Sequence, residues 1–437
     1  MNRRYDINSP GPIVVFFITL GAVLMLGTAG IFLWGIFGEG GRGEKGQVFQ
    51  ADAGNAAETS GQTKSAETGS LWETIPEEWH EEHVLNESEQ PVETESRYAE
   101  ILKDPEYMKE NHIIPWEGSR EDVVTLGFVG DILLDDEYAI MANLLNRGGT
   151  IENGISGEML TCLQDVDILV ANNEFPYTER GKAIEGKAYT FRADPDTAAY
   201  LHDMGVDVAV LANNHMFDFG EEGLLDTLDT LSNAGIPYVG AGRNLKEASA
   251  PVYFIVNDIK IAIVAATQIE RLNNPDTRGA GKNTSGVFRC LDPTKLYEVV
   301  ADAKSSSDFV IVYMHWGTEN ESEPDGAQLE QGPGLAEAGA DLIIGDHPHC
   351  LQGITYFGDV PAIYSLGNFW FNSKTVDTGM VQVEIDKEGL KSFRFIPAIQ
   401  SDCRVDLAYG VEKDRILSYM RELSPGVRID SEGYVSR

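Results

Sequence analysis

Buried strands are the first elements that the pattern of hydrophobic and polar positions predicts. Short and nearly continuous apolar runs recur through the middle of the chain, a pattern typical of strands that are covered on both faces. These runs occupy residues 123–131, 165–174, 205–212, 308–317 and 340–349. Helical patterns separate several of the runs, and such alternation favours parallel strands joined by helices.

A helix and a hairpin complete the expected architecture. The stretch EEGLLDTLDTLSNAG (221–235) places leucines at helical spacing, with acidic residues at its start and Gly235 and Pro237 at its end. Residues 253–266 indicate a hairpin around Asn257 and Asp258, and strand-rich runs continue to residue 399. The expected fold class is α/β, a two-sheet sandwich flanked by helices.

An apolar stretch near the N-terminus indicates a membrane anchor. Residues 12–37 carry no charge, and the uncharged stretch extends from Ile7 to Gly38, longer than the roughly 20 residues needed to cross a bilayer. A cleaved signal peptide is the alternative, but its apolar region is usually only about 7–15 residues long. Arg3 and Arg4 precede the stretch, so we expect a cytoplasmic N-terminus and an extracellular C-terminal domain.

Composition divides the rest of the chain. Residues 1–11 are the expected cytoplasmic N-terminus, 12–37 the transmembrane helix, and 38–118 a disordered acidic stalk, poor in large apolar residues. Residues 119–400 form the expected folded domain, on which a C-terminal extension, 401–437, packs.

The formal net charge of the 437 residues is -37. Nucleic-acid binding requires a basic surface, so we expect no nucleic-acid partner. An anionic ligand would need a local source of positive charge, such as a metal ion.

Polar side chains that can bind a metal follow five of the predicted strands. Four of the eight histidines lie at such strand ends, together with carboxylates and an amide. A lone histidine after a strand is usually a structural residue, but ligands bind at the carboxyl ends of parallel strands, where these side chains would meet. The candidates are Asp131, Glu174, Asn214, His215, His315, His347 and His349. This mixture of donors suits Mn, Fe or Zn, as one or two ions.

The same positions carry a family resemblance. The segments GDILL (130–134), NNE (172–174), LANNHMFDFG (211–220), HWG (315–317), GDHPHCLQGI (345–354) and YSLGNFWF (364–371) resemble the CapA family. CapA proteins act in capsule and poly-γ-glutamate biosynthesis, and their fold is similar to that of calcineurin-like metallophosphoesterases. The resemblance runs from about residue 123 to about residue 397.

The resemblance implies a role for each candidate. It implies metal ligation by six side chains, namely Asp131, Glu174, Asn214, His315, His347 and His349. It implies that His215 approaches the substrate phosphate. By its position three residues further on, Asp218 is a candidate to orient His215, but its place before a predicted helix favours a capping role. The chain departs from the enzymes at Leu133, where they carry a histidine ligand, and at Glu174, where they carry aspartate. Asp346 is a candidate to compensate, as an acidic ligand or as a partner of one.

Candidate substrate-binding residues are Arg192, Arg243 and Asn172. A guanidinium group suits phosphate or carboxylate, although surface ion pairs are the alternative role for both arginines.

Three functions remain open. The resemblance implies a membrane-anchored protein that acts in the synthesis, export or attachment of poly-γ-glutamate or another anionic capsule polymer, with membrane synthase subunits as partners. The second is a metal-dependent hydrolase of phosphoesters or of a cell-surface polymer. The third is a metal-stabilised module that binds polymer carboxylates without chemistry.

Overall fold

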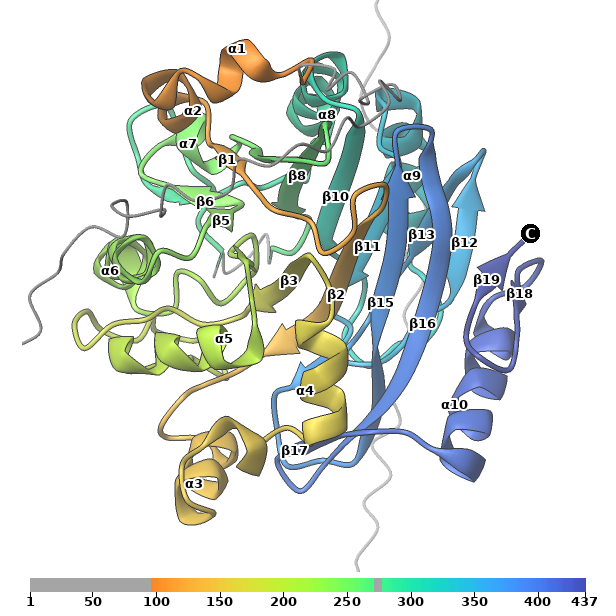
Figure 1. Cartoon of the computed structure of the whole chain (residues 1–437). Helices are drawn as coiled ribbons and strands as arrows, with labels where there is room; N and C mark the ends of the chain where they lie inside the picture. Colours follow the sequence, from red (N-terminus) through yellow and green to blue (C-terminus); the bar gives the residue numbers. More distant parts are fainter. Residues whose placement is uncertain (1–95, 271–276) are drawn as a thin grey trace, which may run out of the picture. The chain divides into compact units, whose positions relative to one another are not determined.

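The computed structural model describes residues 96–270 and 277–437, and two large sheets form the centre of this part of the chain (Figure 1). The first sheet has the strand order β1 (Ile113–Pro115), β7 (Val252–Val256), β8 (Ile259–Thr267), β10 (Phe309–His315), β11 (Leu342–Asp346), β13 (Val360–Ile363) and β12 (Ile354–Phe357). The second has the order β17 (Arg404–Leu407), β16 (Gly389–Ser401), β15 (Val376–Asp386), β2 (Val124–Ile132), β3 (Ile168–Asn173), β4 (Val208–Val210) and β5 (Tyr238–Val239), with β14 (Asn368–Trp370) paired to β2. Two small ribbons pair β6 (Ala241–Gly242) with β9 (Gly286–Val287) and β18 (Arg428–Ile429) with β19 (Val435–Ser436).

Helices flank both sheets. The α-helices are α1 (Ala99–Leu102), α2 (Pro105–Glu110), α3 (Ala139–Asn146), α4 (Gly157–Gln164), α5 (Ala199–Met204), α6 (Gly220–Ala234), α7 (Leu245–Ala248), α8 (Thr294–Ser306), α9 (Gly326–Ala338) and α10 (Gly410–Leu423), and two 3₁₀ turns are η1 (Ile151–Asn153) and η2 (Pro195–Ala198). The expected α/β sandwich of two sheets with helices outside is confirmed. The hairpin is also confirmed, because Val256 pairs with Ile259 across Asn257 and Asp258, both with positive φ.

Alternation along β10 explains the layers. Phe309, Ile311 and Tyr313 face the second sheet and contribute to the core between the sheets. The residues between them, Val310 and Val312, face the other way and pack with apolar side chains of α8 and α9. Each buried side chain of this size contributes roughly 1.5–3 kcal/mol, so the strand is fixed on both faces. On the outer face of the second sheet, a separate core joins β3 and β4 to α3, α4, α5 and α6.

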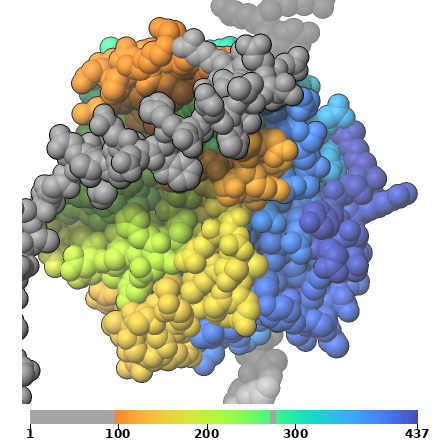
Figure 2. Space-filling view, in the orientation of Figure 1, coloured from red at the N-terminus to blue at the C-terminus, as the bar shows by residue number. Residues whose placement is uncertain are grey.

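Residues 96–118 differ from the expected stalk. This segment forms α1, α2 and β1, and β1 pairs in parallel with β7. Trp116 anchors it, since its indole Nε1 donates to the carbonyl oxygen of Asp167 at 2.7 Å and its ring meets Phe254 edge to face. The orange segment accordingly lies against the rest of the domain in Figure 2. The expected flexible stalk is therefore wrong for residues 96–118, because their few apolar side chains are enough to add an edge strand.

The C-terminal residues extend the fold. Strand β17 joins the second sheet beside β16, and α10 contributes Ile416, Leu417 and Met420 to the core between the sheets. Within the described residues, no helix is both long and apolar enough to span a membrane. The expected anchor, residues 12–37, lies outside the described residues.

Asp207, just before β4, gives a test of this packing. Its carboxylate accepts a hydrogen bond from the amide of Leu169 at 2.8 Å, and burial raises the pKa of Asp207 to about 6. A raised carboxyl pKa stabilises the fold fully below the unfolded value, and that contribution is lost as the pH rises through about 6.

We therefore expect Asp207→Asn to match the wild-type melting temperature near pH 4 and to exceed it at pH 7.5. The expected gain is on the order of 1 kcal/mol, discounted for partial exposure. Thermal melts from pH 4 to 8 test this, and a difference that does not change with pH would contradict it.

Candidate metal centre

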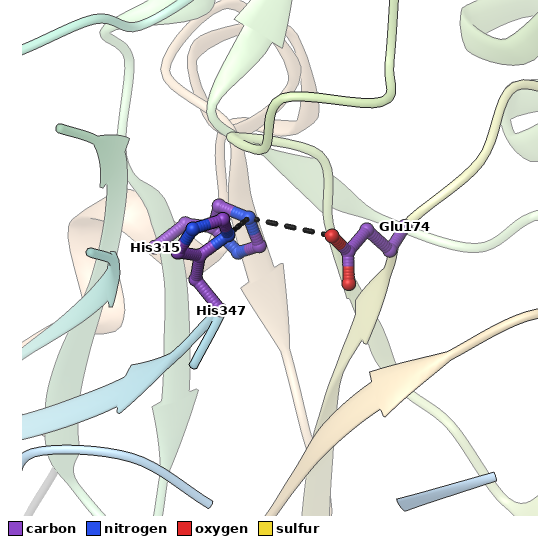
Figure 3. A group of neighbouring side chains, drawn as sticks. All are labelled: Glu174, His315 and His347. Carbon is purple, nitrogen blue, oxygen red and sulfur yellow. Dashed lines mark hydrogen bonds and ion pairs between the residues drawn. The ribbon is translucent and has the colours of Figure 1, made fainter. Parts of the chain in front are cut away.

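The sequence-predicted ligands meet where the carboxyl ends of the two sheets come together. Strands β2, β3 and β4 run parallel in one sheet, and β10 and β11 run parallel in the other. The hydroxyl of Tyr313 on β10 donates to the carbonyl oxygen of Val129 on β2 at 2.7 Å, which holds the two sheets together near this edge. Figure 3 shows Glu174, after β3, facing His315 of β10 and His347, which follows β11.

Three polar atoms converge on one nitrogen of His315. Its Nε2 lies 2.7 Å from Asn214 Oδ1, 3.1 Å from His347 Nδ1 and 3.5 Å from Glu174 Oε1. An imidazole nitrogen carries at most one proton, so it can satisfy only one of these three neighbours. A cation at their centre would satisfy all of them.

A second group surrounds Asp131. His349 Nδ1 lies 3.2 Å from Asp131 Oδ2 and 2.8 Å from Asn368 Oδ1, while Asn172 Nδ2 donates to Asp131 Oδ1 at 2.9 Å. The close approach of β2 to residues 365–368 depends on Gly130, where a Cβ atom would lie 1.9 Å from the carbonyl oxygen of Gly367.

Buried carboxylate oxygens without hydrogen-bond partners test whether the site fits a metal ion. Both carboxylate oxygens of Glu174 and Oδ2 of Asp346 are buried and have no hydrogen-bond partner. Within the described part of the chain, no lysine or arginine forms an ion pair with Asp131, Glu174 or Asp346. An isolated buried charge is strongly unfavourable, so these oxygens require a cation or protons.

The ligand atoms also lie close enough to share ions. They fall into three overlapping groups whose atoms all lie within 4.8 Å of one another: Glu174, His315 and His347; Asp131, His315 and Asp346; and Asp131, Glu174 and His349. Carboxylate, amide and imidazole donors suit Mn, Fe or Zn. The residues therefore fit a divalent metal.

The pKa shifts of Glu174, His315 and His347 agree with this fit. Burial, then the neighbouring carboxylates of Asp131 and Asp346, raise the pKa of Glu174 well above its ordinary value. Burial lowers the pKa of His315 to about 3 and lowers that of His347 as well. Both imidazoles are therefore neutral near pH 7, the form that binds a metal.

Backbone strain marks the loop after β11. His347 has φ 92° and His349 has φ 56°, in the region that residues with a side chain rarely adopt. Such conformations persist where the surrounding structure enforces them, and they cluster at functional sites. Here they turn both imidazoles toward the ends of the strands.

His215 lies beside the ligand groups, and neighbouring side chains fix the orientation of its imidazole. Its Nδ1 lies 2.7 Å from Asp218 Oδ2, and its Nε2 faces Glu174 Oε1 at 4.0 Å. Lys187 Nζ lies 2.6 Å from Asp218 Oδ1 and donates to the carbonyl oxygen of Asn214. Phe191 stacks on the imidazole with ring centres 4.2 Å apart. The ring is therefore fixed in one orientation.

The capping role expected for Asp218 is wrong. Helix α6 begins at Gly220, and its N-cap residue Phe219 makes no side-chain capping bond. The Asp218 carboxylate is instead buried among His215, Lys187 and the amide of Phe191.

The candidate substrate residues are placed differently. Asn172 lies inside the cluster, bonded to Asp131 and Asn213. Arg192 lines a separate pocket of about 290 Å³ with several carboxylates, and its guanidinium lies over the ring of Phe219. Arg243 forms surface ion pairs with Asp229 and Glu247. The structure thus brings Asn172 to the metal ligands and leaves both arginines outside them.

Two contributors were not predicted. Lys187 comes from an irregular segment, and Asn368 begins β14. Asn213, which follows the same strand as Asn214, braces Asn172. The GNF of YSLGNFWF was the available signal for Asn368, because glycine before a polar residue often allows close backbone approach. Nothing in the sequence around Lys187 sets it apart from the other lysines.

Comparisons with known proteins identify relatives of this chain. The family profile described as "Bacterial capsule synthesis protein PGA_cap" matches residues 125–373, more than half of the chain. The PGA biosynthesis protein CapA of Bacillus subtilis (strain 168) is 30% identical over 63% of this chain and 72% of its own. The capsule biosynthesis protein CapA of Bacillus anthracis is 29% identical over 70% and 74%.

Among solved structures, the protein TT1561 of Thermus thermophilus aligns at 8% identity over 62% of this chain and 97% of its own, with a TM-score of 0.34.

Proposed function

We propose the function from one premise, that this chain belongs to the bacterial capsule synthesis protein family PGA_cap. The protein acts in the synthesis, export or attachment of poly-γ-glutamate or another anionic capsule polymer, through a site that binds one or two divalent ions. The names of the relatives in the two Bacillus species support the polymer class. The observation that carries the metal site is the set of buried and unpartnered carboxylate oxygens on Glu174 and Asp346.

Charge explains why a metal suits this polymer. The chain has a formal net charge of -37, and a polyanion would be repelled from most of its surface. A bound divalent ion would supply local positive charge and polarise a substrate oxygen. The polar atoms around His315 Nε2 would hold such an ion where the sheets meet.

Location and partners belong to the same proposal. The uncharged stretch from Ile7 to Gly38 supports a single-pass membrane anchor with the C-terminal domain outside the cell. An anchored accessory protein of this kind would work beside membrane synthase subunits.

We expect the purified full chain to bind poly-γ-glutamate only when loaded with Mn²⁺ or Zn²⁺. Isothermal titration with the polymer, before and after chelation, measures this. Dextran is the matched uncharged polymer and should not bind in either state. Binding of poly-γ-glutamate that chelation leaves unchanged would contradict the proposal.

The His215–Asp218 pair favours a second candidate, a metal-dependent hydrolase. His215 is buried, oriented by a carboxylate 2.7 Å away and aimed at the ligand cluster. An imidazole so placed holds or delivers a proton at Nε2, next to the position of a leaving group. The substrate would be a phosphoester or a bond of the polymer itself.

A further inference from the structure

The pocket that Arg192 lines has a volume of about 290 Å³ and is built from segments that follow β2 and β3. Phe191, the residue before Arg192, stacks on His215, so one segment joins this pocket to the metal centre. Asp135 is buried, and its carboxylate accepts the amide of Arg192 at 2.7 Å and the amide of Glu137 at 2.8 Å. These bonds fix the segments of the wall to each other, so the pocket is a built part of the domain.

The wall of this pocket carries charges of both signs. One guanidinium lines it together with five carboxyl groups, those of Asp135, Asp136, Glu137, Glu179 and Asp194. The guanidinium of Arg192 lies over the ring of Phe219, with its carbon 4.8 Å from the ring centre. In the part of the chain that the structure describes, no carboxylate forms an ion pair with Arg192. A guanidinium that stacks on an aromatic ring keeps the N–H groups at its edge for another partner.

This distribution of charge selects the kind of ligand. The inner part of a polyanion would be repelled by the acidic wall, and a simple cation would leave Arg192 without a role. A ligand that carries a carboxylate and an ammonium suits both, because the guanidinium binds the carboxylate and the acidic groups bind the ammonium. Partial burial, and then the neighbouring carboxylate of Asp194, raise the pKa of Asp136. An ammonium beside these two groups would offset their repulsion.

The proposed polymer offers this pair of charges at one place. In poly-γ-glutamate, each amide joins the γ-carboxyl group of one residue to the α-amino group of the next. Inner residues therefore carry an α-carboxylate and no ammonium. The residue at the amino terminus has both groups, and they lie on the same carbon atom.

We propose that this pocket binds the amino-terminal residue of the γ-linked polymer, with Arg192 on its α-carboxylate and with Asp136 and Asp194 on its ammonium. This rests on the proposed function, which names the polymer, and deepens it by naming the part of the polymer that is recognised. A volume of about 290 Å³ lies at the lower end of the range for small-molecule pockets, about 300–1,000 Å³, and suits one chain end. Through Phe191, the bound end lies next to His215.

The test is isothermal titration of the purified, Mn²⁺-loaded full chain with short γ-linked glutamate trimers of either chirality. The trimer with a free amino terminus should bind at least about 10-fold more tightly than its N-acetylated form, which has lost the ammonium. The α-linked trimer is a matched isomer with the same net charge. Its amino-terminal residue has no free α-carboxylate, so it should also bind at least about 10-fold more weakly.

Two variants assign the two charges to their residues. Arg192→Gln should lower the affinity for the γ-linked trimer by about 10–100-fold and remove the preference over the α-linked isomer. Asp136→Asn should reduce the preference over the acetylated trimer. Arg415→Gln is the matched control, since it removes a surface guanidinium that pairs with Asp377 and Glu412 on another face of the domain, and it should bind as wild type does. Circular dichroism checks the folding of all three variants.

The outcomes separate this inference from the proposed function. If neither the trimers nor long poly-γ-glutamate bind to the metal-loaded wild type, both fail together. If the long polymer binds in a metal-dependent way but free, acetylated and α-linked trimers bind equally, the inference alone is overturned. Free glutamate that binds as tightly as the γ-linked trimer would overturn the assignment to a chain end. Preference for the free γ-linked trimer that is lost in Arg192→Gln and kept in Arg415→Gln supports the proposal.

Discussion

Replacing His347 and His349 together by alanine should lower the affinity for divalent metal by more than about 100-fold, because the change removes one imidazole from each of two ligand groups. His347 Nδ1 faces His315 Nε2, and His349 Nδ1 faces Asp131 Oδ2. The remaining carboxylates would then have fewer imidazole donors with which to share an ion. Metal content by mass spectrometry, after loading with Mn²⁺ or Zn²⁺ and dialysis, measures the loss.

The matched control uses two histidines outside the cluster. His112 and His202 are exposed, and Nε2 of His202 lies 2.7 Å from the carbonyl oxygen of Ala234. Replacing this pair by alanine removes the same number of imidazoles and should leave metal content unchanged. Circular dichroism of both double variants checks folding. If the folded His347/His349 variant retained as much metal as wild type, the assigned metal site would be wrong.

Apolar runs allowed the central strands and the ligand cluster to be predicted. Strand β10 is buried along its whole length and ends at His315, so the place where the apolar run stops is also the edge of the sheet. The same holds for β3, which Glu174 follows. The carboxyl ends of parallel strands lie at the same edge of a sheet. Candidate ligands that are far apart in sequence could therefore be assigned to one site from the sequence alone.

Contacts made by irregular segments could not be predicted in this way. Lys187 reaches Asp218 from 31 positions away, along a segment without regular periodicity. Asp218 stands just before a helix, where local sequence favours a capping role, but Lys187 and His215 offer the buried carboxylate stronger partners. The stalk prediction fails for residues 96–118 for a related reason. Strand β1 is short, and its pairing with β7 and the contacts of Trp116 are tertiary contacts that local sequence does not reveal.

The partners of the two candidate arginines could not be predicted from the sequence either. Arg192 and Arg243 are chemically alike, yet one lines a pocket over Phe219 and the other lies in surface ion pairs. The partner of a long side chain depends on tertiary packing, which the local sequence does not encode.

His215→Ala should abolish hydrolysis of a generic phosphodiester, if the metal-loaded protein catalyses it, while sparing metal content. Loss of a positioned general acid or base lowers kcat by about 10²–10⁴-fold. His215 is not among the residues whose ligand atoms group together, and its Nε2 lies 4.0 Å from Glu174 Oε1. Steady-state rates and metal content, measured on the same preparation, separate catalysis from metal binding.

Asp218→Asn tests the second member of the His215–Asp218 pair. Asparagine keeps the shape but removes the charge that the imidazole faces at 2.7 Å, so kcat should fall while metal content stays constant. His112→Ala, remote from the cluster, should leave both values unchanged. Hydrolysis that persists in His215→Ala would exclude His215 as the proton carrier. Metal-loaded wild type without turnover would exclude the hydrolase for that substrate and leave the capsule role, in which His215 and Asp218 position the polymer rather than cleave it.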